Sequence, residues 1–168
     1  MLCAQVIFCL FVSMNEFVSI RIIDVSDYDL LKQIELDVSN KKYTDLKEEL
    51  NEEILYSFIV SNHDIHLHKQ LKFTIFEGSN KVGFLDIFDV DFNKNCAGIG
   101  IFVLSEFRRK QIASSAIQLG IKWCNNIGIH NFLVEIEKSN DCSIHLFQKA
   151  KFNFVNQNEH YVFLEKYT

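Results

Sequence analysis

Apolar and polar residues alternate with a period of two along several short segments, which is typical of β-strands that bury one face. The predicted strands are 17–24 (FVSIRIID), 71–77 (LKFTIFE), 81–90 (KVGFLDIFDV), 131–137 (NFLVEIE) and the final YVFLEKY. Residues 96–104 (CAGIGIFVL) are nearly all apolar, as expected for a strand with two buried faces. The tripeptide GSN between 71–77 and 81–90 predicts a hairpin.

A period near 3.6 residues marks four other stretches as helices. The first follows Ser26, which we expect to cap it together with Asp29, and the second covers about residues 44–60. The third begins near Ile112 and ends near residue 125, and the fourth is the short segment DCSIHLFQKA. The apolar face of the third helix carries the small residues Ala113, Ala116 and Gly120. This helix is therefore predicted to lie unusually close to a sheet.

Strands and helices that alternate, with a hairpin among them, indicate an α/β or α+β fold around one partly antiparallel sheet. The 168 residues suit a single domain, and we find no repeat, low-complexity segment or linker. The apolar residues 1–13 are too few to span a bilayer and lack the positive region of a secretory signal. We interpret them as an extension outside a core of residues 14–168. An extra edge strand or a partner-binding arm is the alternative.

Composition and charge exclude several classes of function. The net charge of -5 and the acidic pI argue against a general nucleic-acid binder. The chain has five cysteines, an odd number, and none shows CxxC or zinc-type spacing. We therefore expect neither a disulfide framework nor a metal site. Cysteines without disulfides favour a reducing, cytoplasmic location. His63, His66 and His68 lie close together, but no acidic or cysteine partner has metal-site spacing, so we expect them in a loop or on the surface.

Positive charge gathers where the third helix begins. Arg108, Arg109 and Lys110 lie between the strand 96–104 and that helix. The first turn of a helix presents free backbone N–H groups and a partial positive charge, so extra cations there are unfavourable unless an anion binds. Phosphate is the usual ligand of such a strand-loop-helix turn, and arginine can bind it bidentately. A solvated basic turn without a ligand is the alternative.

Two motifs in the second half resemble the Gcn5-related N-acetyltransferase (GNAT) superfamily. Arg108 and Ala113 match the two ends of its Arg-x-x-Gly-x-Gly/Ala turn. The later segment NDCSIHLFQKAKF matches its second motif at Asn140, Ser143, Ile144, Leu146, Lys149 and Phe152. The resemblance covers about residues 17–166 and is closest to the ribosomal-protein and spermidine acetyltransferases. It implies a mixed, mostly antiparallel sheet of six to seven strands, with helices on both faces and a splay between the fourth and fifth strands.

The resemblance also implies acetyl-coenzyme A (acetyl-CoA) as cosubstrate. Its pyrophosphate would lie on the backbone amides of residues 108–113, and its pantetheine arm would pair with the strand at Ile101 and Val103. Gly98 and Gly100 could help that strand bend. The residues predicted to bind the cosubstrate are Ile101, Phe102, Val103, Arg108, Arg109, Lys110, Gln111, Ile112, Ala113, Ser114, Asn140, Ser143, Phe147 and Lys149.

The sequence departs from the family pattern at the glycines and at one tyrosine. Gln111 replaces the glycine of the turn, and Arg109 stands at another position where glycine is frequent. We expect weaker cosubstrate binding. The N–H groups of the turn can still bind phosphate if the local dihedral angles are helical, which glutamine tolerates well. Phe147 replaces the tyrosine that protonates the departing thiolate in many relatives, and Lys151 replaces the glycine before Phe152.

An amine nucleophile must lose a proton before it attacks, and a carboxylate usually removes it. Glu135 is our first candidate for this base; Glu137, Asp86 and Asp89 are the alternatives. The leading hypothesis is a cytoplasmic N-acetyltransferase that acts by direct attack on a polyamine or diamine, a small amine or a protein amino group. We expect no nucleic-acid or membrane partner and leave a homodimer open. The alternatives are a CoA-binding protein with little catalysis and a small interaction domain.

Overall fold

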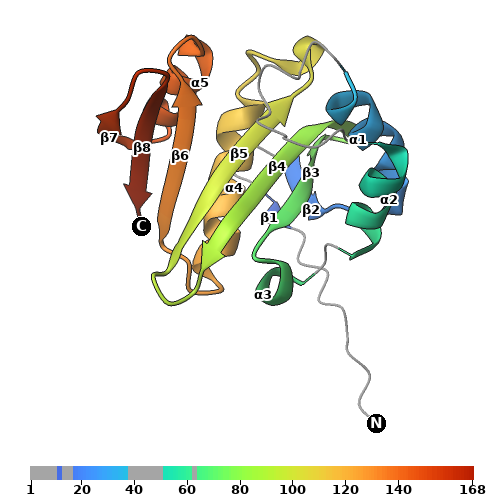
Figure 1. Cartoon of the computed structure of the whole chain (residues 1–168). Coiled ribbons are helices and arrows are strands. Elements are labelled where there is room, and N and C mark those ends of the chain that lie inside the picture. Colours follow the sequence, from blue (N-terminus) through green and yellow to red (C-terminus); the bar gives the residue numbers. More distant parts are fainter. Residues whose placement is uncertain (1–10, 13–16, 38–50, 62–63) are drawn as a thin grey trace.

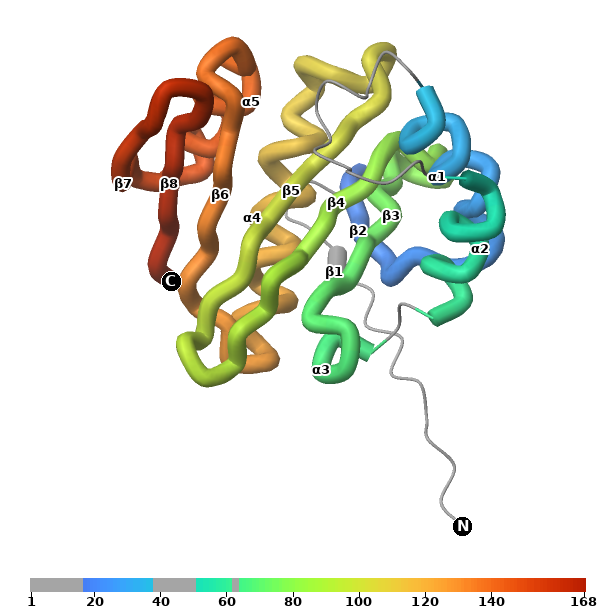
Figure 2. The backbone as a smooth tube through the Cα atoms, in the orientation of Figure 1, coloured from blue at the N-terminus to red at the C-terminus, as the bar shows by residue number. Residues whose placement is uncertain are grey.

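One central sheet organises the chain in the computed structural model, which describes residues 11–12, 17–37, 51–61 and 64–168 (Figures 1 and 2). The strands are β1 (Phe11–Val12), β2 (Val18–Ile22), β3 (Leu71–Glu77), β4 (Asn80–Asp91), β5 (Cys96–Val103), β6 (Asn131–Glu137), β7 (Asn153–Gln157) and β8 (Tyr161–Tyr167). The α-helices are α1 (Tyr28–Glu35), α2 (Glu52–Ser61), α3 (Ile65–His68), α4 (Ile112–Asn125) and α5 (Asp141–Lys149). Two short 3-10 helices, η1 (Val25–Asp27) and η3 (Ser105–Phe107), complete the described elements.

The strand order is β1-β2-β3-β4-β5-β6-β8-β7, and every neighbouring pair is antiparallel except β5 and β6. This mixed, mostly antiparallel sheet confirms the predicted fold class. The sheet has eight strands, however, where six or seven were expected. The two additional strands are β1, which is only two residues long and agrees with the alternative of an extra edge strand in residues 1–13, and β7, whose residues are all exposed and which was not predicted. A strand without a buried face leaves no alternating pattern in the sequence.

Helices cover both faces of the sheet, as predicted. The side chains of α4 and α5 pack with residues such as Leu85 in the larger hydrophobic core. Those of α1 and α2 pack on the opposite face in a second core that includes Phe84. The predicted close approach of α4 is also confirmed, because a Cβ atom added at Gly120 would lie only 2.3 Å from Cδ2 of Leu85.

The pairing between β5 and β6 stops soon after it begins. It joins Cys96 to Asn131, Ala97 to Phe132 and Gly98 to Leu133. Beyond these pairs β5 continues to Val103 and β6 to Glu137, and the two strands diverge towards the top of Figure 1. This is the splay predicted between the fourth and fifth strands, and it leaves an open backbone edge inside the sheet.

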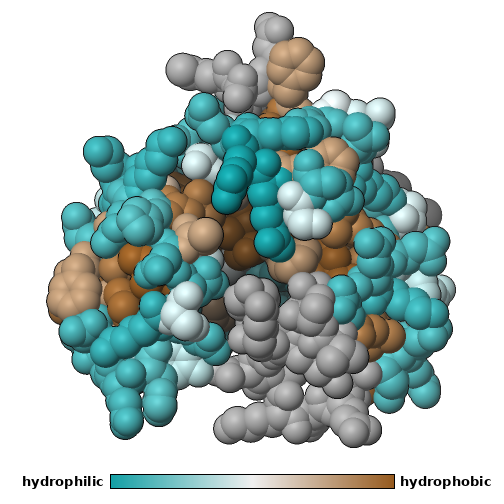
Figure 3. All heavy atoms as spheres, turned by 90° about the horizontal axis from the view of Figure 1, so that it is seen from above, coloured by the Kyte–Doolittle hydropathy of each residue, from teal (hydrophilic) through white to brown (hydrophobic). Residues whose placement is uncertain are grey.

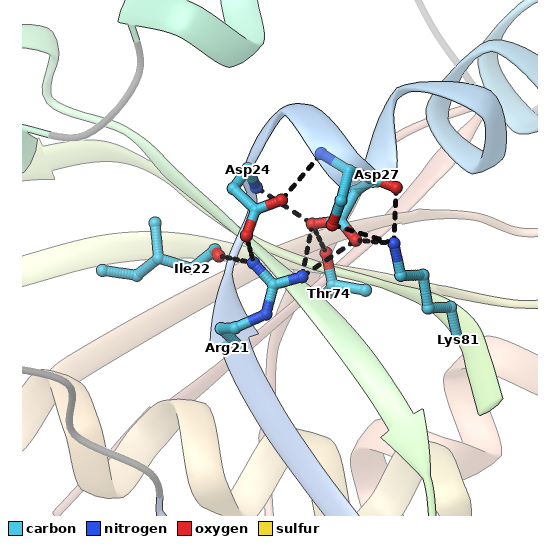
Figure 4. A network of polar contacts seen from close by, with 7 residues as sticks. Arg21, Ile22, Asp24, Asp27, Thr74 and Lys81 are labelled. Carbon is cyan, nitrogen blue, oxygen red and sulfur yellow. Dashed lines mark hydrogen bonds and ion pairs between the residues drawn. The ribbon is translucent and has the colours of Figure 1, made fainter. Parts of the chain in front are cut away.

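The buried carboxylate of Asp27, between β2 and α1, is the centre of a network of polar contacts (Figure 4). Both oxygens of Asp27 accept hydrogen bonds from Arg21, and the carboxylate also contacts Lys81 and the hydroxyl of Thr74. Asp24, rather than the predicted Ser26, caps the helical segment: its side chain accepts from the Ser26 N–H group, and Asp27 returns a capping-box bond. Cations from β2 and β4 and a hydroxyl from β3 thus converge on one side chain.

Near the start of the chain, β1 forms a short edge strand. Phe11 and Val12 pair with Ile20 and Ser19 of β2. Residues 1–10 and 13–16 lie outside the described part of the chain, so the boundary between an extension and a core at residue 14 stays a prediction. The predicted second helix is described only from residue 51 onward, where α2 lies.

Candidate functional site

The turn between β5 and α4 carries a run of free backbone donors. The N–H group of Arg108 donates to the carbonyl of Ser105, and that of Ser115 donates to the carbonyl of Gln111. Between them, the N–H groups of residues 109–114 donate to no backbone carbonyl in the described part of the chain. The free donors at the start of this 14-residue helix confirm that part of the prediction, and such donors can bind an anion.

The backbone of this turn adopts a conformation that favours glycine, although it contains none. Arg109 and Gln111 both have φ of 63°. Gln111 therefore does not meet the condition of helical dihedral angles, since its φ of 63° and ψ of 7° are left-handed. Lys151, where the family motif also has glycine, has φ of 69°. The chain keeps the glycine conformation at each of these positions, and residues whose φ alternates in sign form a concave nest of N–H groups.

The cations of the turn have different partners. Nε of Arg108 donates to the carbonyl oxygen of Val103 at 2.8 Å, and its guanidinium lies over the ring of Phe102. Nζ of Lys110 lies 3.4 Å from a carboxylate oxygen of Glu77. Arg109 is exposed and makes no hydrogen bond or ion pair with any described residue. Arg109 is therefore the cation of the turn whose side chain is available to a ligand.

The second motif forms the beginning and the buried face of α5. Asn140 caps this helix, since its side-chain oxygen accepts from the N–H group of Ser143 at 3.1 Å. Phe147 is buried and packs edge-on against Phe152, with ring centroids 5.0 Å apart. Lys149 is exposed. The structure thus gives Asn140 and Phe147 evident roles in capping and packing, and their contacts with a cosubstrate stay a prediction.

The candidate bases lie on two strands that flank β5. Glu135 is exposed on β6, beyond the last residue that pairs with β5. Glu137, two positions further, accepts a hydrogen bond from Ser139. Asp86 lies on β4 opposite Gly100 of β5, and Asp89 lies at a bulge of β4 with φ of 51°. The structure places Asp86 and Glu135 on opposite sides of β5.

Asp86 belongs to a partly buried ionic cluster that the sequence analysis missed. Nζ of Lys72 lies 2.8 Å from Asp86 and 3.1 Å from Glu35. Lys72 comes from β3 and Glu35 from the end of α1. A charged residue inside the apolar segment LKFTIFE is the only sequence signal of this cluster, and without the fold it names no partner.

The cluster shifts the pKa of two of its members. Burial raises the pKa of the Asp86 carboxyl, and the opposing attraction of Lys72 does not fully offset it. Burial alone would lower the pKa of Lys72, but the charges of Asp86 and Glu35 and their hydrogen bonds raise it above its ordinary value. Lys72 therefore stays protonated, while Asp86 binds a proton more readily than an exposed aspartate.

Two of the sequence predictions concern a metal site and a membrane partner. Within the described ranges, no group of three or more histidine, cysteine or acidic residues could hold a metal ion, and His66 stacks on Phe92. His63 lies outside the described residues. Of the helices described, none is long and apolar enough to cross a membrane.

Viewed from the end where β5 and β6 diverge, apolar side chains lie at the bottom of a hollow between polar margins (Figure 3).

Comparisons with known proteins agree with this geometry. Residues 31–152 match the model of the acetyltransferase (GNAT) family. A search of curated protein sequences gives no match. Among solved structures, the RimL ribosomal L7/L12 alpha-N-protein acetyltransferase in complex with coenzyme A has a TM-score of 0.79 at 16% identity, over 95% of this chain and 98% of that one.

Two other solved structures share the fold at similarly low identity. The ribosomal-protein-S5-alanine acetyltransferase from Vibrio fischeri has a TM-score of 0.79 at 15% identity, over 95% of this chain and 96% of that one. A spermidine N-acetyltransferase chimera from Vibrio cholerae and hSSAT has a TM-score of 0.73 at 13% identity, over 89% of this chain and 95% of that one. At such identities the likeness establishes the fold and leaves the acceptor open.

Proposed function

This chain belongs to the GNAT acetyltransferase family, whose members take acetyl from acetyl-CoA, and we propose that it transfers the acetyl group to a primary amine by direct attack. The acceptor is a polyamine or diamine, a small amine or a protein amino group. One observation carries the proposal: β5 separates from β6 after Gly98 and ends in a turn whose backbone donors are free from residue 109 to 114.

The open edge of β5 suits the pantetheine arm. Amide groups of an extended ligand can pair with an unpaired strand edge as an added strand would. Ile101 and Val103 lie on this part of β5, and the carbonyl of Val103, which already accepts from Arg108, keeps a second lone pair. The pyrophosphate then falls at the end of the strand, on the N–H groups of residues 109–114, with Arg109 adding charge.

Phe147 of α5 bears on how the departing thiolate is protonated. Phe147 stands where many relatives have a tyrosine, and a phenyl ring cannot donate a proton. We infer that the departing thiolate takes its proton from the nucleophile or from water. A coenzyme A thiolate is a good leaving group, so transfer can proceed without an acid from the protein. The acetyl-CoA binding turn and strand then contribute alignment more than acid catalysis.

A CoA-binding protein with little catalysis is the second candidate. The absence of a hydroxyl at Phe147 and the non-glycine residues at 109 and 111 favour it. The two candidates make the same prediction for acetyl-CoA binding and different predictions for thiol release, so an assay of turnover separates them.

Two measurements test the function. Isothermal titration with acetyl-CoA should show one site per chain, and a matched Arg109→Glu variant should bind at least tenfold more weakly because it places a carboxylate beside a phosphate. Thiol release should then be followed with butylamine, spermidine, amino acids and peptides with free amino termini. Binding without thiol release from any amine would select the second candidate. Failure of the wild-type chain to bind acetyl-CoA would remove both.

A further inference from the structure

Two rows of side chains cross the sheet on the face that α1 and α2 cover. In the first row, Phe88 of β4 is paired with Gly98 of β5, and Gly98 is paired with Leu133 of β6. Phe88 and Leu133 are 38% and 43% exposed, so the first row presents an apolar surface where the splay begins. Residues paired across neighbouring strands point to the same face, so these positions lie side by side.

The second row lies where β6 has left β5. Asp86 of β4 is paired with Gly100 of β5. On β6 the matching position is Glu135, two residues beyond Leu133 and therefore on the same face. A carboxylate thus stands on each side of Gly100, one on the neighbouring strand and one across the open gap.

Gly100 leaves free space between Asp86 and the open edge. A Cβ atom added at Gly100 would meet Phe88 at 3.6 Å and Asp86 at 3.7 Å, which are ordinary van der Waals distances. Strands lie about 4.8 Å apart, so a ligand chain on the open edge of β5 would lie about 10 Å from β4. An amine nitrogen placed over Gly100 could be about 3 Å from Asp86 and a similar distance from a thioester carbon, which is the separation that proton transfer and attack require.

The ionic cluster fixes Asp86 in this position. Both Asp86 oxygens contact Nζ of Lys72, at 2.8 and 3.0 Å, and Lys72 is held from the other side by Glu35. Asp86 is 33% exposed, whereas the side chains of Lys72 and Glu35 are only 10% and 14% exposed. The cluster holds two negative charges and one positive charge, so it attracts a cation, and Asp86 is its most accessible member.

We propose that Asp86 is the catalytic base that takes a proton from the acceptor ammonium over Gly100, with Lys72 and Glu35 as positioning residues. The acceptor is a primary amine on an apolar stem, which would lie on Phe88 and Leu133. This assignment rests on the proposed acetyl transfer. It takes the role first assigned to Glu135, which then attracts the ammonium from across the gap.

The chemical step balances without a further reactant. Asp86 removes one proton from the ammonium and releases it to water through its exposed side. The free amine attacks the thioester carbon, an N–C bond forms, and the C–S bond breaks as its electrons pass to sulfur. The second proton that the nitrogen loses goes to the thiolate, so the products are an acetylated amine, the coenzyme A thiol and one proton in solution.

The test compares Asp86→Asn with Asp91→Asn in the full chain. Asp91 is the last residue of the same strand, and an asparagine oxygen can still accept from the N–H groups of Asn93 and Lys94, so the control keeps the turn and changes the same charge. With the best amine among butylamine, spermidine and a peptide with a free amino terminus, Asp86→Asn should lower kcat/KM at pH 7 by about 100-fold or more, and Asp91→Asn by less than twofold. Acetyl-CoA affinity should change less than twofold in both.

The pH profile separates a base from a structural residue. The charged groups that face Asp86 are Lys72 of β3 and Glu35 of α1, with Glu135 across the gap. If Asp86 is the base, the Asp86→Asn defect should shrink as pH rises towards the pKa of the amine, near 10.4 for an alkylamine, because the free amine then needs no base. Asp86→Glu should restore part of the rate at pH 7. A purely structural defect would persist at every pH.

Each outcome decides the assignment. Suppose that the wild-type chain releases thiol, and that the kcat/KM of Asp86→Asn stays within threefold of the wild-type value with the same pH dependence. Asp86 is then not the base. If Glu135→Gln instead shows a defect that shrinks as pH rises, that role returns to Glu135. If Asp86→Asn loses acetyl-CoA binding through misfolding, the Gly100→Ala variant replaces it as the test. The added methyl group should raise the KM of the amine at least fivefold while acetyl-CoA affinity stays intact. An unchanged KM would overturn the proposal. Absence of wild-type turnover rejects the proposed function itself.

Discussion

Nε of Arg108 donates a hydrogen bond to the carbonyl oxygen of Val103 at 2.8 Å and so ties the basic turn back to the end of β5. The same guanidinium lies 5.5 Å from the centre of the Phe102 ring. These contacts occupy the arginine that the family motif places first in the turn. Its effect on a bound pyrophosphate is therefore exerted through the shape of the turn, while Arg109 extends into solvent.

Replacing Arg108 with methionine tests this division. Arg108→Met keeps the length and the apolar stem of the side chain but loses the hydrogen bond, so the free energy of unfolding should fall by about 1 kcal/mol. Acetyl-CoA affinity should fall by about three- to tenfold, because the turn is no longer held to β5. Urea unfolding and isothermal titration measure the two effects.

Arg109→Met is the matched control, since it removes a neighbouring charge that has no partner in the described chain. Its stability should equal that of the wild type, and its loss of acetyl-CoA affinity should be largest at low ionic strength, where charges are least screened. Equal loss of stability in the two variants would show that the Arg108 hydrogen bond does not hold the turn.

Gln111→Gly should stabilise the protein. Gln111 has φ of 63°, a left-handed conformation that costs an ordinary L-residue about 1–2 kcal/mol and glycine almost nothing. Part of this gain is lost because glycine is more flexible in the unfolded chain, so we expect an increase of about 0.5–1 kcal/mol in the free energy of unfolding. Gln111→Ala should show no increase, because alanine has the same steric conflict, and a gain in both variants would point to the glutamine side chain instead.

The glycine positions show where sequence reasoning stops. The motif located the turn at residues 108–113, and the structure has free N–H groups from 109 to 114. The left-handed angles of Gln111 could not be predicted, because local preference disfavours a left-handed glutamine. Tertiary constraint overrides that preference at Arg109, Gln111 and Lys151 alike. Such a conflict between a residue and its backbone is visible only in the folded structure.

The ionic cluster shows a second limit. The alternation in 81–90 and 131–137 placed Asp86 and Glu135 on strands that flank β5, as the structure confirms. Their relation to Gly100 depends on the register of three strands and on where β5 leaves β6. The other members of the cluster, Glu35 of α1 and Lys72 of β3, lie 51 and 14 positions before Asp86 in the chain. No periodic pattern links residues so far apart.

Gly120→Ala should destabilise the packing of α4 on the sheet. Its Cβ would lie 2.3 Å from Cδ2 of Leu85, a fully buried side chain of β4. Either the helix or the leucine must move, and overpacking of this kind costs about 1–3 kcal/mol, more than the gain in helix propensity of about 1 kcal/mol. Gln118→Ala, on the exposed side of the same helix, should change the unfolding free energy by less than 0.5 kcal/mol, a threshold typical of surface substitutions. A stable Gly120→Ala protein would mean that α4 can shift away from β4.

Asp27→Ala should be the most destabilising of these substitutions. Asp27 is fully buried and accepts hydrogen bonds from Arg21 and Thr74, and it also pairs with Lys81. Removing one partner from a buried ionic network leaves the remaining charges without compensation, which costs about 3–5 kcal/mol. Thr74→Val keeps both cations paired and removes only one hydrogen bond, so it should cost about 1 kcal/mol. Urea unfolding followed by circular dichroism compares the two, and similar losses would show that Arg21 and Lys81 find other partners when the carboxylate is gone.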